Sequence, residues 1–256
     1  MTARKPHPLA IALPEAQFPV TICVLAYGAN ARMAKRFLAS LYDCTDPRLF
    51  SLRAGLNAVE PATRKLFRKY ASRHGNVTLF VSRKNIFKSP MMRRMFYDPP
   101  LATAWTIWCD DDTHFLRRDW LPRLGLKIEQ SPKVSMWGRP YALWSTDASI
   151  VDWIKGALWY RGKRCVRAKD PKGKKAIKFR FAPGAFWAAR TEILRRLNWP
   201  DPRLIHANED FLLGEALRQN DLILGRFDYG VNINDAPRRN PHAPEVERIG
   251  FQPVDR

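Results

Sequence analysis

The alternation of apolar strand-like segments with amphipathic helical segments is the feature that most constrains the fold of this chain. Apolar runs occupy residues 20–27, 49–59, 76–82 and 103–109, and helical patterns follow the first three at 31–42, 60–75 and 89–98. Continuous apolar strands are typical of a sheet covered on both faces, and strand–helix alternation indicates parallel pairing. The expected fold class is therefore α/β, with a mainly parallel central sheet flanked by helices. Asn30 is expected to cap the first helix.

Size and composition favour a single globular domain over residues 1–256. Hydrophobic residues make up 46% of the 256 residues, which is enough for one substantial core. No apolar run reaches the roughly 18 residues that a membrane-spanning helix needs, so no transmembrane segment is expected. The first 20 residues are interrupted by prolines and are expected to lead into the first strand rather than to form a signal peptide. The four cysteines lack CxxC spacing, which favours free thiols in the cytoplasm.

Positive charge is concentrated in one segment of the chain. The whole chain carries 44 Lys and Arg against 24 Asp and Glu, and residues 155–180 contain eleven basic residues and a single acid, Asp170. Such a segment repels itself unless a polyanion lies nearby, so we expect nucleic acid as a partner, with an anionic membrane surface or a merely solvated loop as alternatives. The expected nucleic-acid contacts are Lys163, Arg164, Arg167, Lys172, Lys174, Lys175 and Lys178.

Aromatic residues are interleaved with this basic run. Trp153, Trp159, Tyr160 and Phe179 could stack on or wedge between bases, or they could pack onto the sheet, as Trp153 is expected to do. Residues 161–175 offer almost nothing to bury, so they are expected to be exposed and mobile until an anion orders them.

Three consecutive aspartates, Asp110, Asp111 and Asp112, follow the apolar strand at 103–109. Ligands of open α/β sheets bind at the carboxyl ends of the strands, and the aspartates occupy such an end. Strand alternation points Asp110 and Asp112 one way and Asp111 the other, an arrangement suited to Mg²⁺ or Mn²⁺. The alternative is an acidic cap for the helix near residues 118–128, but Asp119 is closer to that helix.

These segments carry a resemblance to a known family. The strand, loop and helix followed by an apolar strand ending in "CDDD" resemble the nucleotide-sugar-binding half of a GT-A glycosyltransferase, with Asp110–Asp112 as its Asp-x-Asp signature. Residues 179–225 are similar to the acceptor side of the family 2-like glycosyltransferases, where Glu209-Asp210 matches an acidic pair that opens a helix. The resemblance covers about residues 19–235 without 145–178. It implies a GT-A (nucleotide-diphospho-sugar transferase) fold with a donor half at 19–116 and an acceptor half at 117–240, interrupted by a basic insertion at 145–180.

The resemblance also implies a role for individual residues. Asp112 would bind the metal directly, Asp110 would lie near the metal or the ribose, and Asp111 is included on the donor side. Asp210 would be the base of an inverting transfer, with Glu209 as the alternate. His242 would be a further metal ligand, and His206 is a looser candidate. Gly184 would allow a close backbone approach near the acceptor. The remaining expected donor-binding residues are Ala26, Tyr27, Asn57 and Arg83.

Together, the site and the charge predict a metal-dependent glycosyltransferase. The resemblance implies Mn²⁺ or Mg²⁺ and a nucleotide sugar, with a UDP-sugar favoured. The basic segment favours a DNA acceptor, specifically a hydroxymethylated base of the 5-hydroxymethylcytosine type, as in a phage-type DNA-modifying enzyme in the host cytoplasm. The alternatives are a lipid-linked or cell-surface glycan at an anionic membrane, a metal-dependent nuclease, and a DNA-binding module without catalysis.

Overall fold

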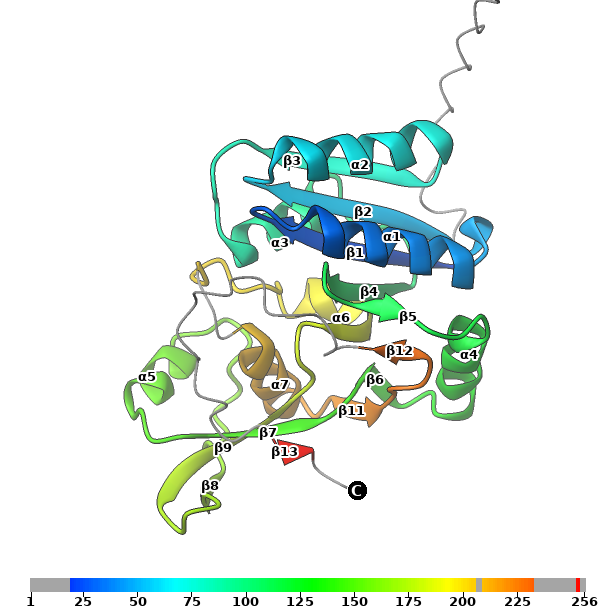
Figure 1. Cartoon of the computed structure of the whole chain (residues 1–256). Coiled ribbons are helices and arrows are strands. Elements are labelled where there is room, and N and C mark those ends of the chain that lie inside the picture. The colour runs from blue at the N-terminus through cyan, green and yellow to red at the C-terminus, as the bar shows by residue number, and fades with distance from the viewer. Residues whose placement is uncertain (1–18, 206–208, 233–251, 254–256) are drawn as a thin grey trace, which may run out of the picture.

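The computed structural model describes residues 19–205, 209–232 and 252–253. Its centre is a seven-stranded sheet in the order β11-β6-β10-β4-β1-β2-β3 (Figure 1). Strands β3, β2, β1 and β4 run parallel, β11 is parallel to β6, and β10 is antiparallel to both of its neighbours. The expected α/β class with a mainly parallel sheet is confirmed. The strands are β1 Val20–Tyr27, β2 Phe50–Asn57, β3 Val77–Ser82, β4 Trp105–Asp110, β6 Val134–Gly138, β10 Phe186–Arg190 and β11 Ile223–Arg226.

Helices connect and cover these strands. In Figure 1, α1 and α2 lie side by side, and α3 packs against β1, β2 and β3. The helices are α1 Ala31–Cys44, the 3₁₀ turn η2 Pro47–Leu49, α2 Pro61–Arg73, α3 Lys88–Tyr97, α4 Trp120–Gln130, α5 Ser149–Lys155, α6 Thr191–Arg196 and α7 Glu209–Gln219. None of the described helices is both long enough and apolar enough to cross a bilayer.

Two helix starts differ from the sequence-based expectation. Asn30 does not cap α1: its side chain donates to the Tyr27 carbonyl at 3.0 Å, and Glu60 Oε1 accepts from the Ala31 N–H at 3.0 Å instead. Asp119 precedes α4, but its carboxylate binds Arg123 and Tyr229 rather than the helix backbone. For α1, a residue distant in sequence, Glu60, thus takes the place of the local cap.

A smaller sheet contains most of the basic segment. Its order is β13-β7-β9-β8, from β7 Tyr141–Ser145, β8 Arg167–Lys169, β9 Lys175–Phe181 and β13 Gln252–Pro253. A two-stranded sheet joins β5 His114–Phe115 to β12 Val231–Asn232. Residues 161–175 are mostly exposed, as expected, but from Arg167 onward they form regular structure, since β8 and β9 make an antiparallel hairpin whose turn is held by Asp170 Oδ1.

The hydrophobic core lies on both faces of the central sheet, as the apolar strands predict. Trp108 of β4 and Trp187 of β10 stack with ring centroids 6.2 Å apart, and Phe96 of α3 meets both rings edge-on. These rings are buried and fasten α3 to the middle of the sheet. The start of α3 lies beside the carboxyl end of β4, because Lys88 is 3.3 Å from Asp110 and lies over the Trp108 ring.

Candidate active site

The strand ends bring residues from distant parts of the sequence to one edge of the central sheet. The register pairs Tyr27 with Asn57 and Leu25 with Asp110, so β1, β2 and β4 end close together. Helix α3 begins at this edge with Lys88, and Glu209 and Asp210 form the first turn of α7.

Lys88 lies at the centre of this group. Its ammonium is 2.7 Å from Glu209 Oε1 and 3.3 Å from Asp110 Oδ1, and it lies over the Trp108 ring at 5.7 Å from the centroid. Burial alone would disfavour the charged form, but the negative charges of Asp110, Asp210 and Glu209 outweigh burial and raise the Lys88 pKa above its ordinary value. The structure thus brings the Asp-x-Asp region and the Glu-Asp pair together around one half-buried cation.

Asp210 is half-buried beside this ion-pair cluster. Burial raises its pKa to about 7, Lys88 opposes that rise, and the charges of Glu209 and Asp110 add to it. Its Oδ2 accepts a hydrogen bond of 2.7 Å from the Gly184 N–H, which favours the ionised form. A carboxyl with a pKa near neutrality can take up or release a proton at physiological pH.

Gly184 is required by the closeness of these groups. A Cβ at this position would lie 2.5 Å from Lys88 Nζ and 2.8 Å from Asp210 Oδ1, distances that no real side chain shows. Both atoms are the ends of flexible side chains, so a Cβ here would displace the Lys88 ammonium and the Asp210 carboxylate from their present contacts. The expected close approach at Gly184 is therefore seen, and its target is the Lys88–Asp210 pair.

The three aspartates occupy different environments. The Asp110 side chain is 21% exposed and faces Lys88, Asp111 is fully buried, and Asp112 is half-buried. Asp111 thus differs from both neighbours in burial, and β4 ends at Asp110, so Asp111 and Asp112 lie in the turn that follows the strand. A donor could reach the Asp111 carboxylate only after a rearrangement. The Asp112 carbonyl accepts a 2.9 Å hydrogen bond from Arg36 of α1, which holds the turn after β4 against that helix.

The expected donor-binding residues lie at the same sheet edge. Tyr27 is 43% exposed and could stack on a base, Ala26 is fully buried within the sheet, and Arg83 is exposed beyond β3. Asn57 is buried and acts on the loop before α3, because its Oδ1 accepts from the Ile86 N–H and its Nδ2 donates to Asn85, both at 2.9 Å. The Asn57 side chain therefore holds residues 85–86 in position, and Lys88 follows shortly after them at the start of α3.

Two residues of this edge were not expected from the sequence. Lys88 precedes the expected helix 89–98, but one lysine among 44 basic residues has no distinguishing pattern. Asn85 donates to the Tyr27 hydroxyl at 3.4 Å and accepts from the Phe87 N–H at 2.8 Å. An Asn shortly after a strand is a known turn signal and could have been noticed on that ground.

The carboxylates at this edge could supply part of the ligand set of a hard divalent cation such as Mg²⁺. Within residues 19–205, 209–232 and 252–253, no group of three His, Cys, Asp or Glu side chains is arranged to hold an ion alone. His206 and His242 lie outside the described residues. Mg²⁺ is commonly held by one or two carboxylates together with substrate phosphates, and the oxygens of Asp110 and Asp112 fit that type of site.

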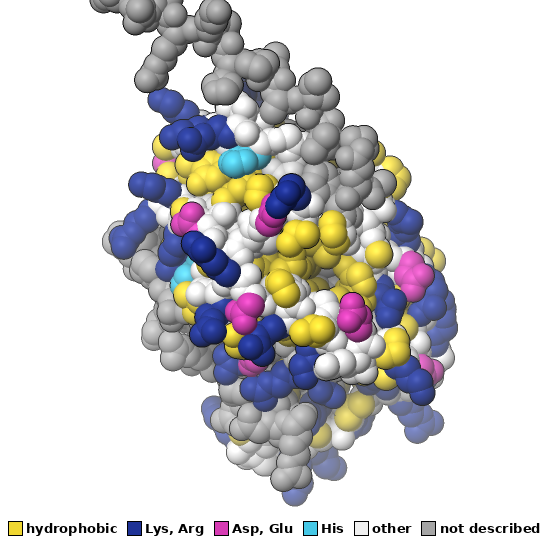
Figure 2. Space-filling model, turned by 90° about the vertical axis from the view of Figure 1, so that its right-hand side faces the viewer, with side chains coloured by type: hydrophobic (Ala, Val, Ile, Leu, Met, Phe, Trp, Pro, Cys, Tyr) yellow, Lys and Arg dark blue, Asp and Glu magenta, His cyan; other side chains and the backbone are white. Residues whose placement is uncertain are grey.

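Positive charge is widespread on the surface, so charge alone does not mark a site. Figure 2 shows Lys and Arg side chains over the displayed face, with Asp and Glu side chains among them. The basic segment differs because it has eleven basic residues and one acid. Its Lys172, Lys174 and Lys175 are exposed at and beside the β8–β9 turn, while Lys163 is paired with Asp221 at 2.5 Å and Lys178 lies over the Trp144 ring.

Three of the four aromatic residues of the basic segment, Trp153, Trp159 and Phe179, do not present their rings to a ligand, whereas Tyr160 is half-buried. Trp159 and Phe179 are each only 1% exposed, and Phe179 packs against Phe211 of α7. Trp153 packs against Trp159 and is covered by the Arg203 guanidinium at 4.1 Å. The expectation that Trp159 and Phe179 stack on bases is therefore wrong. Because β9 alternates, its apolar side chains face α7 while its cations face outward.

The comparisons with known proteins concern the fold. No family model and no curated protein matches this chain. Residues 1–349 of S. aureus TarS superpose on this chain with a TM-score of 0.54 at 12% sequence identity, and the superposition covers 82% of this chain and 58% of that one. The same protein in complex with UDP-GlcNAc gives a TM-score of 0.53 at 12% identity and covers 82% of this chain and 56% of that one. The mannosyltransferase PcManGT from Pyrobaculum calidifontis, in complex with GDP-Man and Mn²⁺, gives 0.47 at 18% identity, with 75% and 50% covered. This chain spans less than two thirds of each of these structures. The likeness to TarS confirms the GT-A-like fold expected from the sequence.

Proposed function

We propose that this chain, which has a GT-A-like fold, transfers a sugar from a nucleotide-diphosphate sugar to an acceptor hydroxyl with the help of Mn²⁺ or Mg²⁺. The observation that carries the proposal is the convergence of Asp110, Lys88, Glu209 and Asp210 at the carboxyl edge of the parallel strands. Ligands of open α/β sheets bind at this edge. The complex of TarS with UDP-GlcNAc supports a nucleotide sugar as the donor type, and we propose a UDP-sugar.

Asp210 is the proposed general base. Its pKa of about 7 means that a large fraction of the carboxyl is ionised at neutral pH, where it can accept the proton of the acceptor hydroxyl. As the acceptor oxygen loses its proton to Asp210, it would form the new bond to the anomeric carbon of the donor sugar. The bond between that carbon and the diphosphate oxygen would break on the opposite side, which inverts the configuration of the anomeric carbon. Glu209 is less suited to this role because its Oε1 is bound to Lys88 at 2.7 Å.

The donor side is assigned to the end of β4 and the neighbouring loops. Asp112 and Asp110 are the proposed ligands of the divalent ion, with His242 as a proposed third ligand. When bound, the ion supplies Lewis-acid stabilisation of the negative charge on the leaving diphosphate. Lys88 neutralises the carboxylate of Asp110 and adds positive charge beside it. The nucleoside is assigned to the exposed side chains of Tyr27 and Arg83, with Asn57 holding the neighbouring loop. Ala26 and Asp111 are fully buried and would contact the nucleoside only after a rearrangement.

A hydroxymethylated base in DNA is the acceptor that we propose. The support for it is the exposed positive charge of residues 155–180, since the buried rings of Trp159 and Phe179 remove the stacking argument. We propose that the reaction takes place in the cytoplasm, inside the host if the protein is viral.

A transfer assay tests these assignments. The protein is incubated with 5-hydroxymethylcytosine DNA, a set of UDP- and GDP-sugars and Mn²⁺, and the nucleosides are analysed by mass spectrometry. We expect a sugar on the modified base, and a loss of roughly 100-fold or more with Asp210→Asn because general-base catalysis contributes that much.

Each failure has a distinct meaning. Transfer by Asp210→Asn at the wild-type rate would reject the base assignment. Donor hydrolysis without transfer to DNA would reject the acceptor and leave the donor side intact. Cleavage of DNA without any sugar nucleotide would instead establish a nuclease.

A further inference from the structure

A basic cavity lies between α5 and the loop that precedes β8. Its volume is about 410 Å³, and its lining includes four cations, Lys155, Lys163, Arg164 and Arg167, beside Tyr160. The described residues that line it include no carboxylate. Four positive charges around one concave site make it a candidate for an anionic ligand.

The cations of this cavity are available to a ligand. Arg164 and Arg167 are exposed and form no ion pair with any residue in the described part of the chain. Lys155 pairs with Asp152 at 2.9 Å and Lys163 with Asp221 at 2.5 Å, but these carboxylates are 80% and 87% exposed. Exposed ion pairs contribute little free energy, so a bound phosphate can replace them at small cost.

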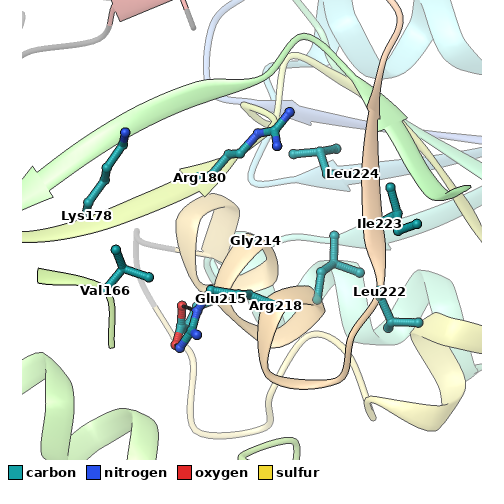
Figure 3. A pocket seen from close by; sticks show the side chains of 10 residues that line it. Val166, Lys178, Arg180, Gly214, Glu215, Arg218, Leu222, Ile223 and Leu224 are labelled. Carbon is teal, nitrogen blue, oxygen red and sulfur yellow. Dashed lines mark hydrogen bonds and ion pairs between the residues drawn. The ribbon is translucent and has the colours of Figure 1, made fainter. Parts of the chain in front are cut away.

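A second cavity is less suitable for an anion. It measures about 450 Å³ and lies between β9, α7 and β11 (Figure 3). Its wall carries the Glu215 carboxylate, which accepts hydrogen bonds of 2.6 and 2.8 Å from Arg218. Leu222 and Leu224 supply an apolar lining. Three cations, Lys178, Arg180 and Arg218, also line the second cavity, but the Glu215 carboxylate offsets one of them, whereas the basic cavity has no carboxylate among its described lining residues.

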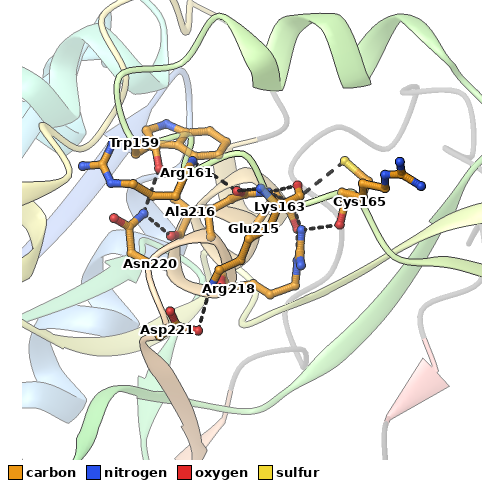
Figure 4. Close-up of polar contacts among 11 residues, drawn as sticks. Trp159, Arg161, Lys163, Cys165, Glu215, Ala216, Arg218, Asn220 and Asp221 are labelled. Carbon is orange, nitrogen blue, oxygen red and sulfur yellow. Dashed lines mark hydrogen bonds and ion pairs between the residues drawn. The ribbon is translucent and has the colours of Figure 1, made fainter.

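The basic cavity is fixed to the carboxyl end of α7 by a hydrogen-bond network (Figure 4). Gln219 Oε1 accepts from the N–H groups of Arg161 at 3.2 Å and Lys163 at 3.1 Å, and its Nε2 donates to the Lys163 carbonyl at 2.7 Å. Arg218 donates to the Arg164 carbonyl at 3.0 Å. Asn220 donates to the Trp159 carbonyl at 2.8 Å. The cation-bearing loop therefore keeps a defined position relative to this helix.

Helix α7 connects the cavity to the candidate active site. It begins with Glu209 and Asp210 and ends at Gln219, which binds the cavity loop. Its 11 residues rise by about 1.5 Å each, which separates its two ends by roughly 15 Å. One element thus carries the carboxylates at its first turn and binds the cation-bearing loop at its last, so its length sets the scale of their separation.

We propose that the basic cavity binds one backbone phosphate of the nucleic-acid acceptor and anchors the strand at a fixed distance from the reacting hydroxyl. This inference rests on the proposed function for the identity of the acceptor. Phosphates of one DNA strand advance by about 3.4 Å along the axis, so roughly 15 Å corresponds to about four nucleotides. The anchored phosphate therefore lies about four nucleotides from the target base.

Binding of DNA to paired variants tests the location of the site. The affinity for a labelled oligonucleotide of roughly 20 nucleotides is measured by fluorescence anisotropy at several salt concentrations, without nucleotide sugar. The test variant is Arg164→Ala with Arg167→Ala. The matched control is Lys172→Ala with Lys174→Ala, which removes the same charge from the β8–β9 turn. All four side chains are exposed, so unchanged melting temperatures are expected.

A localised phosphate site predicts unequal losses. We expect the cavity variant to bind DNA about tenfold more weakly than the wild type. The slope of log affinity against log salt concentration should become shallower by about one to two. The control variant should lose less than about threefold in DNA affinity. Equal losses would overturn the proposal, because they indicate a diffuse attraction to the whole segment. Binding of anionic phosphatidylglycerol vesicles with the same Arg164 and Arg167 dependence, and none of DNA, would overturn nucleic acid as the source of the phosphate.

Replacing single phosphates by neutral methylphosphonates tests the spacing. We expect one substitution, about four nucleotides from the modified base, to weaken wild-type binding by the same factor as the cavity variant and to have little effect on that variant. Equal effects at all positions would reject the fixed distance. Failure of the proposed function is separate, since it appears as the absence of donor hydrolysis and transfer by the unmodified protein whatever its DNA affinity.

Discussion

Replacing Lys88 with Met removes the cation at the centre of the candidate active site and keeps a side chain of similar length. Glu209 is only 5% exposed and is bound to the Lys88 ammonium at 2.7 Å, while Asp110 lies at 3.3 Å. Removing one partner of a buried ion pair leaves an uncompensated charge, which costs about 3–5 kcal/mol. We therefore expect the free energy of unfolding, measured by urea denaturation at neutral pH, to fall by about that amount.

The same substitution has an effect on pH dependence whose sign is defined. The Lys88 charge lowers the Asp210 pKa, which lies at about 7, so its loss raises that pKa further. The base must be ionised, so the acid limb of kcat/KM for donor hydrolysis or transfer moves to higher pH. The raised pKa of Asp210 also makes the free energy of unfolding depend on pH. A carboxyl with a raised pKa stabilises the fold below its unfolded pKa of about 4, and this contribution is lost as pH rises through about 7.

The double variant Lys88→Met with Glu209→Gln separates electrostatics from packing. Because the glutamine amide is neutral, the buried charge at this position disappears, and we expect much of the lost stability to return. A Lys88→Met protein as stable as wild type, with an unmoved acid limb, would refute the ion-pair reasoning. An equally unstable double variant would show that the loss comes from the lysine stem.

Further predictions concern the neighbouring positions. Gly184→Ala should lower transfer by at least about tenfold with a smaller effect on the melting temperature, because its Cβ displaces the Asp210 carboxylate and a 1 Å misplacement can cost that much or more; normal kinetics would contradict it. Asp112→Asn should abolish both Mn²⁺-dependent donor binding, measured by calorimetry, and transfer, and EDTA should do the same to the wild type; activity that survives both would reject the metal role. Gly214→Ala should destabilise the protein by about 1–3 kcal/mol in urea denaturation, since its Cβ would collide with the Arg180 carbonyl of β9; an unchanged midpoint would show that α7 can shift.

Much of the architecture is contained in local patterns. The apolar runs at 20–27, 76–82 and 103–109 correspond to β1, β3 and β4, within two residues at each end. Strand direction follows from the alternation with helices, and the position of Asp110 at a strand end follows from where the apolar run stops. Periodicity depends only on residues near in sequence, which explains why it can be read directly.

The basic segment shows where local patterns were read incompletely. In β9 the apolar Ile177, Phe179 and Phe181 are buried, while Lys178 and Arg180 lie on the opposite face. This alternation of period two predicts a half-buried strand, and it could have excluded Phe179 as a stacking residue. Trp159 carried no comparable signal, because its burial depends on packing against Trp153 and the surrounding residues.

The sequence alone determined the α/β class, the aspartates at the end of β4 and the Glu209-Asp210 pair that opens α7. Only the tertiary structure decided that Lys88 joins these carboxylates, that the Gly184 N–H binds Asp210, and that α7 links the candidate active site to a basic cavity. The physical reason is the range of the interactions: strands and helices follow from neighbouring residues, whereas a buried ion pair exists only when packing brings distant segments within a few ångströms.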